Sequence, residues 1–231
     1  MTYILHYAPD NASLIIRLAF EYRGLPYRTC LVDRSVNAQA SAPYRALNPN
    51  GQIPVLETPE GPIFETGAIL LWLADTHGGL GPQTDSSERA AFLKWLFFIS
   101  NTIHPAMRMM FYPEKYISTD HSTALRSGLK AQLQQSFLRL DKIASTGPAW
   151  LGAKTPTILD FYCAALLRWP ALYPISEDRS WFSLSNYPAL FDICVNVERL
   201  ACTAALRSAE GLGPSPFTNP HLPNPPIGSA T

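Results

Sequence analysis

The sequence lacks an excess of charge of either sign. Its 231 residues contain 18 Lys and Arg against 18 Asp and Glu, which gives a formal net charge of +0. Proteins that bind nucleic acid or anionic membranes usually present strongly basic surfaces, so this balance argues against both as general partners. No apolar run is long enough to span a bilayer, and the nearest candidate, FLKWLFFIS, contains Lys94. No membrane span is predicted.

The chain also has no recognisable targeting signal and few cysteines. The opening MTYILHYAPD has neither a basic region nor a long apolar region, so no signal peptide is predicted and a cytoplasmic location is expected. None of the four cysteines forms a CxxC pair, and no His lies at zinc-finger spacing from two of them. They are Cys30, Cys163, Cys194 and Cys202. We therefore expect no metal site and four reduced, mostly buried thiols.

What the chain does contain is an alternation of strand and helix patterns in its first eighty residues. Aromatic and β-branched runs bounded by Gly and Pro indicate strands, and apolar positions at helical spacing indicate helices. The predicted strands cover residues 2–7, 27–32, 53–57 and 62–65, and the predicted helices cover 13–24, 42–47 and 67–79. The order β-α-β-α-β-β-α is that of a small open α/β domain.

Strand signals stop after a linker rich in Gly, Pro and Ser at 78–87. Helical patterns follow at 86–110, 123–144, 155–169 and 187–209. Capping-box spacings occur at Asp85 with Glu88 and at Thr157 with Asp160. From Gly211 onward the chain is rich in Pro and is expected to be irregular. The predicted domains are 1–78, 86–211 and a Pro-rich tail at 212–231.

The stretch NPNGQIPVLETPEGPIFETGAI, residues 48–69, resembles the Asn-Pro-x-Gly-x-Val-Pro-x-Leu segment of the cytosolic glutathione transferases and the acid-plus-hydroxyl pair that follows it. TILD at 157–160 is similar to the capping box of the family's buried sixth helix, and NYPALFDICVNVERL with AEGL is similar to the last helices of bacterial members. The resemblance covers residues 2 to about 212. It implies a thioredoxin-like N-terminal domain joined to an all-α C-terminal domain.

The resemblance also implies where glutathione, the substrate, would bind. In the family the Pro of this motif is cis, and only an X-Pro bond makes cis inexpensive, at about 0.5–1 kcal/mol. A cis Ile53-Pro54 bond would turn the Ile53 N–H and C=O outward to pair with an extended peptide. At the start of the next helix, Thr66 suits the γ-glutamyl carboxylate and Glu65 the neighbouring ammonium. Gln52 is expected to lie alongside.

The donor that activates the glutathione thiol would follow the first strand, within HYAPDNASLIIR. Set against the bacterial cysteine-type pattern Tyr-x-Pro-x-x-Cys-Ser-Leu, the catalytic Cys falls on Ala12, which removes that mechanism. Asn11 and Ser13 together are the favoured donors. Tyr7 is the alternative, although its spacing to Arg17 is one residue short of the tyrosine-type pattern. An N-cap role for Ser13 is equally compatible with the sequence.

His104 occupies a position where similar bacterial members have a His, and it could donate a hydrogen bond to the sulfur or supply positive charge. The alternative is a helical His beside a kink at Pro105, with its hydrogen bonds satisfied by the backbone. Met107, Arg108 and Phe111 continue the same face and are expected to line a cleft for a hydrophobic electrophile. The same residue types also form ordinary helix cores.

Three functions remain open from the sequence. The first is a glutathione transferase, a detoxification-type enzyme that conjugates glutathione to a small hydrophobic co-substrate. The second is glutathione-dependent thiol–disulfide oxidoreduction, and the third is a non-enzymatic glutathione-binding or protein-interaction domain, since a fold does not determine a function. The resemblance also implies a homodimer.

Overall fold

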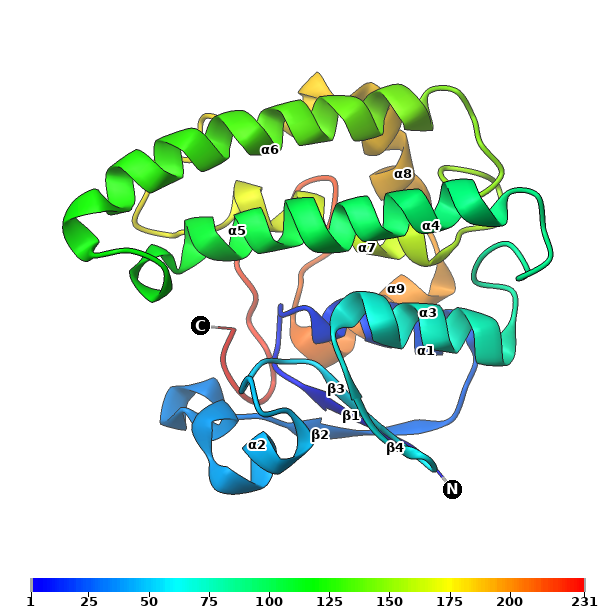
Figure 1. Cartoon of the computed structure of the whole chain (residues 1–231), viewed down its shortest axis with the longest axis horizontal. Helices are drawn as coiled ribbons and strands as arrows, with labels where there is room; N and C mark the ends of the chain where they lie inside the picture. Colours follow the sequence, from blue (N-terminus) through cyan, green and yellow to red (C-terminus); the bar gives the residue numbers. More distant parts are fainter. Residues whose placement is uncertain (1, 231) are drawn as a thin grey trace. The chain divides into compact units, whose positions relative to one another are not determined.

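The computed structural model describes residues 2–230, and its first element is a four-stranded mixed sheet in the order β2-β1-β3-β4 (Figure 1). The strands are β1 (Tyr3–Tyr7), β2 (Tyr27–Leu31), β3 (Val55–Thr58) and β4 (Gly61–Phe64). β1 pairs with β2 in parallel, whereas β3 is antiparallel to both β1 and β4. This is a thioredoxin-like arrangement, and it confirms the predicted β-α-β-α-β-β-α order.

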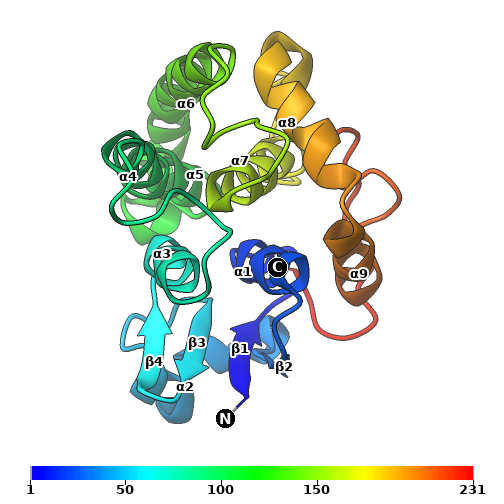
Figure 2. The ribbon, with the colours of Figure 1, turned by 90° about the vertical axis from the view of Figure 1, so that its right-hand side faces the viewer.

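Three helices complete this part of the chain: α1 (Ser13–Arg23), α2 (Ala42–Leu47) and α3 (Thr66–His77). α1 and α3 lie on one side of the sheet and α2 on the other (Figure 2). The apolar stripe of α1 is buried because every third or fourth residue faces the sheet. The fully buried core includes Leu5, Leu14, Ile15, Leu18, Phe20, Leu56, Ile69 and Leu70.

The described chain forms two compact units, one made of residues up to Gly81 together with residues from Glu198 onward, and one made of Pro82–Val197. α9 (Ala201–Glu210) and the Pro-rich tail therefore group with the sheet, whereas the predicted helical domain extended to residue 211. As predicted, residues 212–230 contain no helix or strand, but Leu212 and Phe217 are buried. The three-part division into functional domains stays a prediction.

The second unit is helical, as predicted. Its helices are α4 (Arg89–Phe98), a π-helical segment (Ile99–Ile103), α5 (His104–Phe111), α6 (Ser122–Ala144), α7 (Ile158–Arg168) and α8 (Pro188–Glu198), whose last residue belongs to the first unit. Short 3-10 turns lie in this unit at Pro113–Lys115, Thr119–His121, Trp169–Ala171 and Leu184–Asn186, and in the first unit at Arg34–Val36 and Ala38–Ala40. Every residue of α7 is buried. No helix of residues 2–230 is both long and apolar enough to cross a membrane.

One predicted helix cap is confirmed. Thr157 Oγ1 accepts a hydrogen bond from the Leu159 amide at 3.1 Å, and Asp160 Oδ2 accepts one from the Thr157 amide at 2.7 Å. Asp160 Oδ1 also accepts the Gly152 amide at 2.7 Å. Burial raises the pKa of Asp160 to about 6, and these hydrogen bonds oppose that shift.

The other predicted cap is wrong. α4 begins at Arg89 rather than near Ser86, and Glu88 makes no side-chain cap. The Glu88 carboxylate instead accepts a hydrogen bond from the Trp150 indole N–H at 2.8 Å. A distant partner has therefore taken the side chain that the local pattern assigned to the helix terminus.

Candidate functional site

The predicted site residues of the first unit meet at one edge of the sheet. In the strand register His6 lies opposite Val55, and Val55 lies opposite Phe64. The end of β1, the start of β3 and the end of β4 are therefore neighbours. The segments that continue from these positions are Tyr7–Ser13, Gln52–Pro54 and Glu65–Thr66. The sheet therefore brings together the residues predicted to bind glutathione and the predicted thiol donors Tyr7, Asn11 and Ser13.

The loop before β3 is held by two side chains from outside the predicted site. The Tyr44 hydroxyl and the Asn48 side-chain amide each donate a hydrogen bond to the Gln52 carbonyl at 2.8 Å. Asn48 Oδ1 accepts the Asn50 amide at 3.0 Å, and Asn48 is only 2% exposed. These bonds fix the Gln52 backbone, while the Gln52 side chain is exposed.

Ile53 presents its backbone beside this loop. The Ile53-Pro54 bond is cis, as predicted. Within residues 2–230, neither the amide nor the carbonyl of Ile53 has a hydrogen-bond partner. Its side chain packs against the small cluster of Val32, Tyr44 and Val55. The peptide group at Ile53 is thus held in place by its side chain and free to pair with an extended ligand.

Glu65 and Thr66 lie where β4 passes into α3. Glu65 has a φ of 74°, a left-handed conformation that is uncommon for a residue with a side chain. Such backbone strain persists where the surroundings impose it, and it is concentrated at functional sites. The Glu65 side chain is exposed, whereas Thr66, the first residue of α3, is 6% exposed. An acid and a hydroxyl therefore flank the positive end of a helix.

The loop after β1 holds the predicted thiol donors in different environments. Asn11 Oδ1 accepts the Ala12 amide at 2.8 Å, which leaves the Asn11 side-chain NH2 without a partner among the described residues. Ser13 is fully buried, donates its hydroxyl proton to the Ala8 carbonyl at 3.1 Å and accepts the Ala8 amide at 3.3 Å. In this geometry Asn11 is available to a ligand and Ser13 closes the loop on itself.

Tyr7, the third predicted donor, is 4% exposed at the end of β1. The guanidinium of Arg17 lies 4.8 Å from the centre of its ring. Burial raises the pKa of Tyr7, and the positive charge of Arg17 partly offsets this. The phenol therefore remains protonated at neutral pH.

The residues predicted to line an electrophile cleft belong to the second unit, on α5. His104 Nδ1 is hydrogen bonded to the Tyr162 hydroxyl at 2.8 Å, so its partner is a side chain. Burial, together with neighbouring Arg108, lowers the pKa of His104 to about 4. A positive charge on His104 is therefore disfavoured at neutral pH. Met107 is fully buried, and Phe111 packs edge-on against Tyr173, with 6.1 Å between the centres of the two rings.

Arg108 is directed to a neighbouring aromatic residue. Its Nη1 donates a hydrogen bond to the Tyr116 hydroxyl, and its guanidinium lies 5.5 Å from the centre of the Tyr116 ring. Together with the buried Met107, this shows that the α5 residues have partners within the second unit. Their part in binding a co-substrate stays a prediction.

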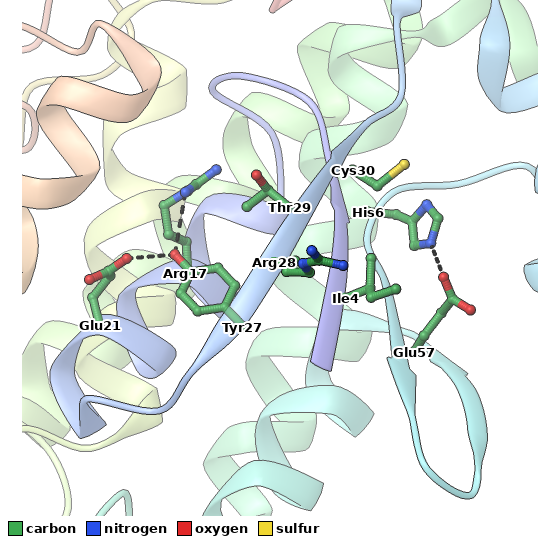
Figure 3. A pocket seen from close by; sticks show the side chains of 9 residues that line it. All are labelled: Ile4, His6, Arg17, Glu21, Tyr27, Arg28, Thr29, Cys30 and Glu57. Atoms are coloured by element: carbon green, nitrogen blue, oxygen red, sulfur yellow. Dashed lines mark hydrogen bonds and ion pairs between the residues drawn. The ribbon is translucent and has the colours of Figure 1, made fainter. Parts of the chain in front are cut away.

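A cavity of about 720 Å³ lies elsewhere in the first unit, across the exposed part of the sheet (Figure 3). None of the predicted glutathione-binding residues lines it. His6 Nε2 is paired with Glu57 at 2.7 Å within it. Its lining consists of Ile4, His6, Arg17, Glu21, Tyr27, Arg28, Thr29, Cys30 and Glu57.

The cysteines and possible metal ligands give no further site. Cys30 is exposed on β2, while Cys163, Cys194 and Cys202 are buried, and all four are free thiols, as predicted. In the part of the chain that the structure describes, no group of three or more His, Cys, Asp or Glu side chains could hold a metal ion.

Comparison with known proteins agrees with this architecture. The N-terminal domain of glutathione S-transferases matches residues 1–75. "Glutathione S-transferase GST-4.5" of Xanthomonas campestris is 29% identical over 169 residues, which cover 71% of this chain and 81% of that protein. "Disulfide-bond oxidoreductase YfcG" of Escherichia coli is 28% identical over 193 residues, which cover 80% of this chain and 85% of that protein.

Solved structures give the same result over most of the chain. A sphingomonad glutathione S-transferase complexed with glutathione has a TM-score of 0.75 and 26% identity, covering 91% of this chain and 100% of that one. A Burkholderia graminis glutathione transferase with two bound glutathione molecules has a TM-score of 0.75 and 26% identity, with coverage of 90% and 88%. The fold is thus that of a glutathione transferase. Residues 1–75 match the N-terminal domain of the glutathione S-transferase family, and the chain as a whole is a homologue of bacterial glutathione S-transferases.

The sequence interpretation missed the contributions of Tyr44, Asn48 and Glu210 to the site. Asn48 belongs to the quoted motif, but its side chain was assigned no role, although an Asn before Pro is a common turn residue. Glu210 was seen only as part of a helix end, yet its carboxylate bonds the Asp10 amide beside the predicted donors at 2.9 Å. No local signal could reveal the Glu210 contact, because 200 residues separate its partners.

Proposed function

We propose that this protein binds glutathione between Ile53 and Thr66 and transfers its thiolate to a small hydrophobic electrophile. The observation that supports this most strongly is the unpaired Ile53 peptide group at the same sheet edge as the N-terminus of α3. When an extended peptide pairs with Ile53, its neighbouring residue lies near the start of α3. The carboxylate of that residue then faces Thr66, and its ammonium group faces Glu65. Glutathione has this chemistry, and it is bound by the structural neighbours.

The chemistry requires a lowered thiol pKa. An ordinary thiol has a pKa near 8.5, so most free glutathione is protonated at pH 7. In the proposed complex the Asn11 NH2 donates to the sulfur, and the N-terminus of α1 adds positive potential. The thiol proton passes to solvent. The thiolate then forms a C–S bond with the electrophilic carbon, and the leaving group departs with the electron pair.

A second candidate is glutathione-dependent disulfide reduction. It is favoured by the relation to YfcG, named a disulfide-bond oxidoreductase. Because Ala12 has no thiol, glutathione itself would have to attack the substrate disulfide. In this case the bound thiolate attacks a disulfide of the substrate. This forms a mixed disulfide between glutathione and one half of the substrate and releases the other half as a thiol. A second glutathione thiolate then attacks the glutathione sulfur of the mixed disulfide, which gives glutathione disulfide and releases the remaining substrate thiol.

A panel of three measurements distinguishes these functions. They are binding of glutathione by calorimetry, conjugation of a generic aryl halide, and reduction of a small disulfide at the expense of glutathione. Conjugation with little disulfide reduction supports the transferase, and the reverse supports the oxidoreductase. Binding without either activity supports a glutathione-binding module, while absence of binding contradicts the proposal as a whole.

The position of the ligand is tested with Glu65→Ala. Loss of a charged hydrogen bond to the ammonium group is expected to weaken glutathione binding by about 1.5–3 kcal/mol. Glu60→Ala is the matched control, because Glu60 is an exposed acid in the β3–β4 turn, away from the proposed ligand. Equal affinities of the Glu65→Ala variant and the wild type would exclude this placement.

A further inference from the structure

Glu210, the last residue of α9, is a fully buried acid at the base of the β1–α1 loop. Its Oε2 accepts a hydrogen bond from the Asp10 amide at 2.9 Å, and its Oε1 accepts one from Arg17 Nε, also at 2.9 Å. The Glu210 carboxylate therefore links the C-terminal end of α9 to the β1–α1 loop and to α1. All three residues belong to the first compact unit.

The residue held by Glu210 is conformationally unusual. Asp10 has a φ of 48°, in the left-handed region that residues with side chains seldom adopt. It is 5% exposed and immediately precedes Asn11, whose side-chain NH2 is the available donor of the loop. A strained backbone persists only where surrounding contacts impose it. The hydrogen bond from the Asp10 amide to Glu210 is a contact of this kind.

Arg17 links this carboxylate to a chain of polar groups. Its Nη1 donates to the Tyr27 hydroxyl at 3.3 Å, and that hydroxyl donates to Glu21 at 2.6 Å (Figure 3). Arg17 also lies over the ring of Tyr7, at the end of β1. The ion pair of Arg17 and Glu210 thus has contacts with β1 and β2 as well as α1. A change in the charge of Glu210 therefore acts on the loop that contains the predicted donors.

We propose that Glu210 is a positioning residue for thiol activation. Its ionised carboxylate holds the Asp10 amide, and with it the loop that presents Asn11, in the geometry that meets the glutathione sulfur. Protonation of Glu210 weakens this hold. The inference rests on the proposed function, because it assigns to a distant acid the placement of the donor used in that reaction.

The electrostatics place this control near neutral pH. Complete burial raises the pKa of Glu210 to about 7, and this shift is opposed by Arg17 and by the Asp10 amide and increased by the Asp10 carboxylate. A protonated acid has one oxygen that acts as a donor, so it cannot accept both hydrogen bonds equally well. The titratable and charged groups that act on Glu210 are Asp10 in the loop, Arg17 on α1 and Tyr7 on β1, and Tyr27 on β2 and Glu21 on α1 are linked to it through Arg17.

The direct test needs no glutathione. The amide resonances of Asp10 and Asn11 are followed by NMR between pH 5.5 and 8.5 in the wild type and in Glu210→Gln. In the wild type these resonances are expected to shift with a midpoint near pH 7, and in Glu210→Gln to lose this transition. Absence of any transition in the wild type overturns the proposal, even if the variant fails to fold.

The functional test follows the absorbance of the bound thiolate and the pH dependence of kcat and KM. Glu210→Gln is expected to lower kcat about tenfold to hundredfold, as for a misplaced catalytic group, with KM changed less than about twofold. The pH profile of Glu210→Gln should also lack the decrease in kcat that the wild type is expected to show below about pH 7. Preservation of the wild-type pH profile and kcat in Glu210→Gln overturns the positioning role.

Glu198→Gln is the matched control. Glu198 also accepts backbone amides within the first unit, from Phe217 at 2.9 Å and Thr218 at 3.0 Å, but it anchors the C-terminal tail instead of the Asp10 loop. It should keep the wild-type kcat and pH profile, and an effect equal to that of Glu210→Gln would contradict a specific role. If wild-type protein fails to ionise bound glutathione, the proposed function fails. If the wild type ionises bound glutathione and Glu210→Gln ionises it with the same pH dependence, only the positioning role of Glu210 fails.

Discussion

The side-chain amide of Asn48 donates a hydrogen bond to the carbonyl of Gln52 at 2.8 Å, across the turn that leads into the cis Ile53-Pro54 bond. The same side chain accepts the Asn50 amide at 3.0 Å. One buried amide therefore satisfies groups on both sides of Gly51, which itself has a positive φ of 60°. The backbone that would face glutathione is shaped by a residue that need not touch the ligand.

Replacement of Asn48 should reduce stability and affinity together. Asn48→Ala leaves buried polar groups without their partners, at a cost of about 1–3 kcal/mol in the free energy of unfolding. The loosened Gln52–Ile53 backbone should also weaken glutathione binding. Asn50→Ala, at an exposed position in the same turn, is the control and should change neither quantity. Urea unfolding and calorimetry measure the two effects, and wild-type values for Asn48→Ala would contradict this role.

The three candidate donors should behave differently on mutation. Asn11→Ala is expected to raise the pKa of the bound glutathione thiol and to lower conjugation about tenfold to hundredfold, because its NH2 is the open donor. Ser13→Ala should mainly lower stability, since the Ser13 hydroxyl bonds the Ala8 backbone. Absorbance of the thiolate against pH separates these effects. If only Tyr7→Phe raises the thiol pKa, the tyrosine is the donor and this assignment is wrong.

His104 should contribute a loss of stability in mild acid. Its pKa is lowered from 6.5 to about 4 in the folded chain, so between these values the unfolded chain binds more protons. The contribution of His104 to the free energy of unfolding should therefore decrease as pH drops from 6.5 toward 4, by up to about 3 kcal/mol. The raised pKa values of Asp160 and Glu210 act in the opposite sense over this range, so the effect is measured as the difference between the wild type and a variant without His104. His104→Asn keeps an amide for Tyr162 but cannot titrate, and should flatten this part of the curve.

The control for this pH dependence is His121→Asn, because His121 is exposed in the same unit. Urea unfolding at several pH values between 4 and 7 supplies the comparison. The explanation fails if His104→Asn retains the full wild-type slope, or if His121→Asn removes it.

A homodimer is expected in solution. Closed two-fold symmetry is the commonest arrangement of soluble oligomers, and α4 exposes Phe97 to 52% in the isolated chain. Light scattering at micromolar concentration should give about twice the chain mass of 25.6 kDa. A mass equal to that of a single chain would contradict the prediction.

Much of the fold could be predicted because its signals are local. The strand and helix order of the first eighty residues follows from apolar periodicity and from Gly and Pro at the turns. The reciprocal cap of Thr157 and Asp160 is local too, since its partners are three residues apart. The motif around Pro54 and the pair of Glu65 and Thr66 likewise lie within one continuous stretch, so the sequence was sufficient to identify the candidate ligand-binding segments.

What only the tertiary structure decided are the contacts between residues far apart in the chain. The local pattern made Glu88 a helix cap, but Trp150, 62 residues away, took its carboxylate. Ser13 is a predicted thiol donor by its position in the sequence, and only the tertiary structure shows that its buried hydroxyl bonds the Ala8 backbone. Glu210 and Asp10 became partners because α9 packs against α1. A side chain's periodicity can be read along the chain, whereas its hydrogen-bond partner depends on which segments folding brings within about 3 Å of it.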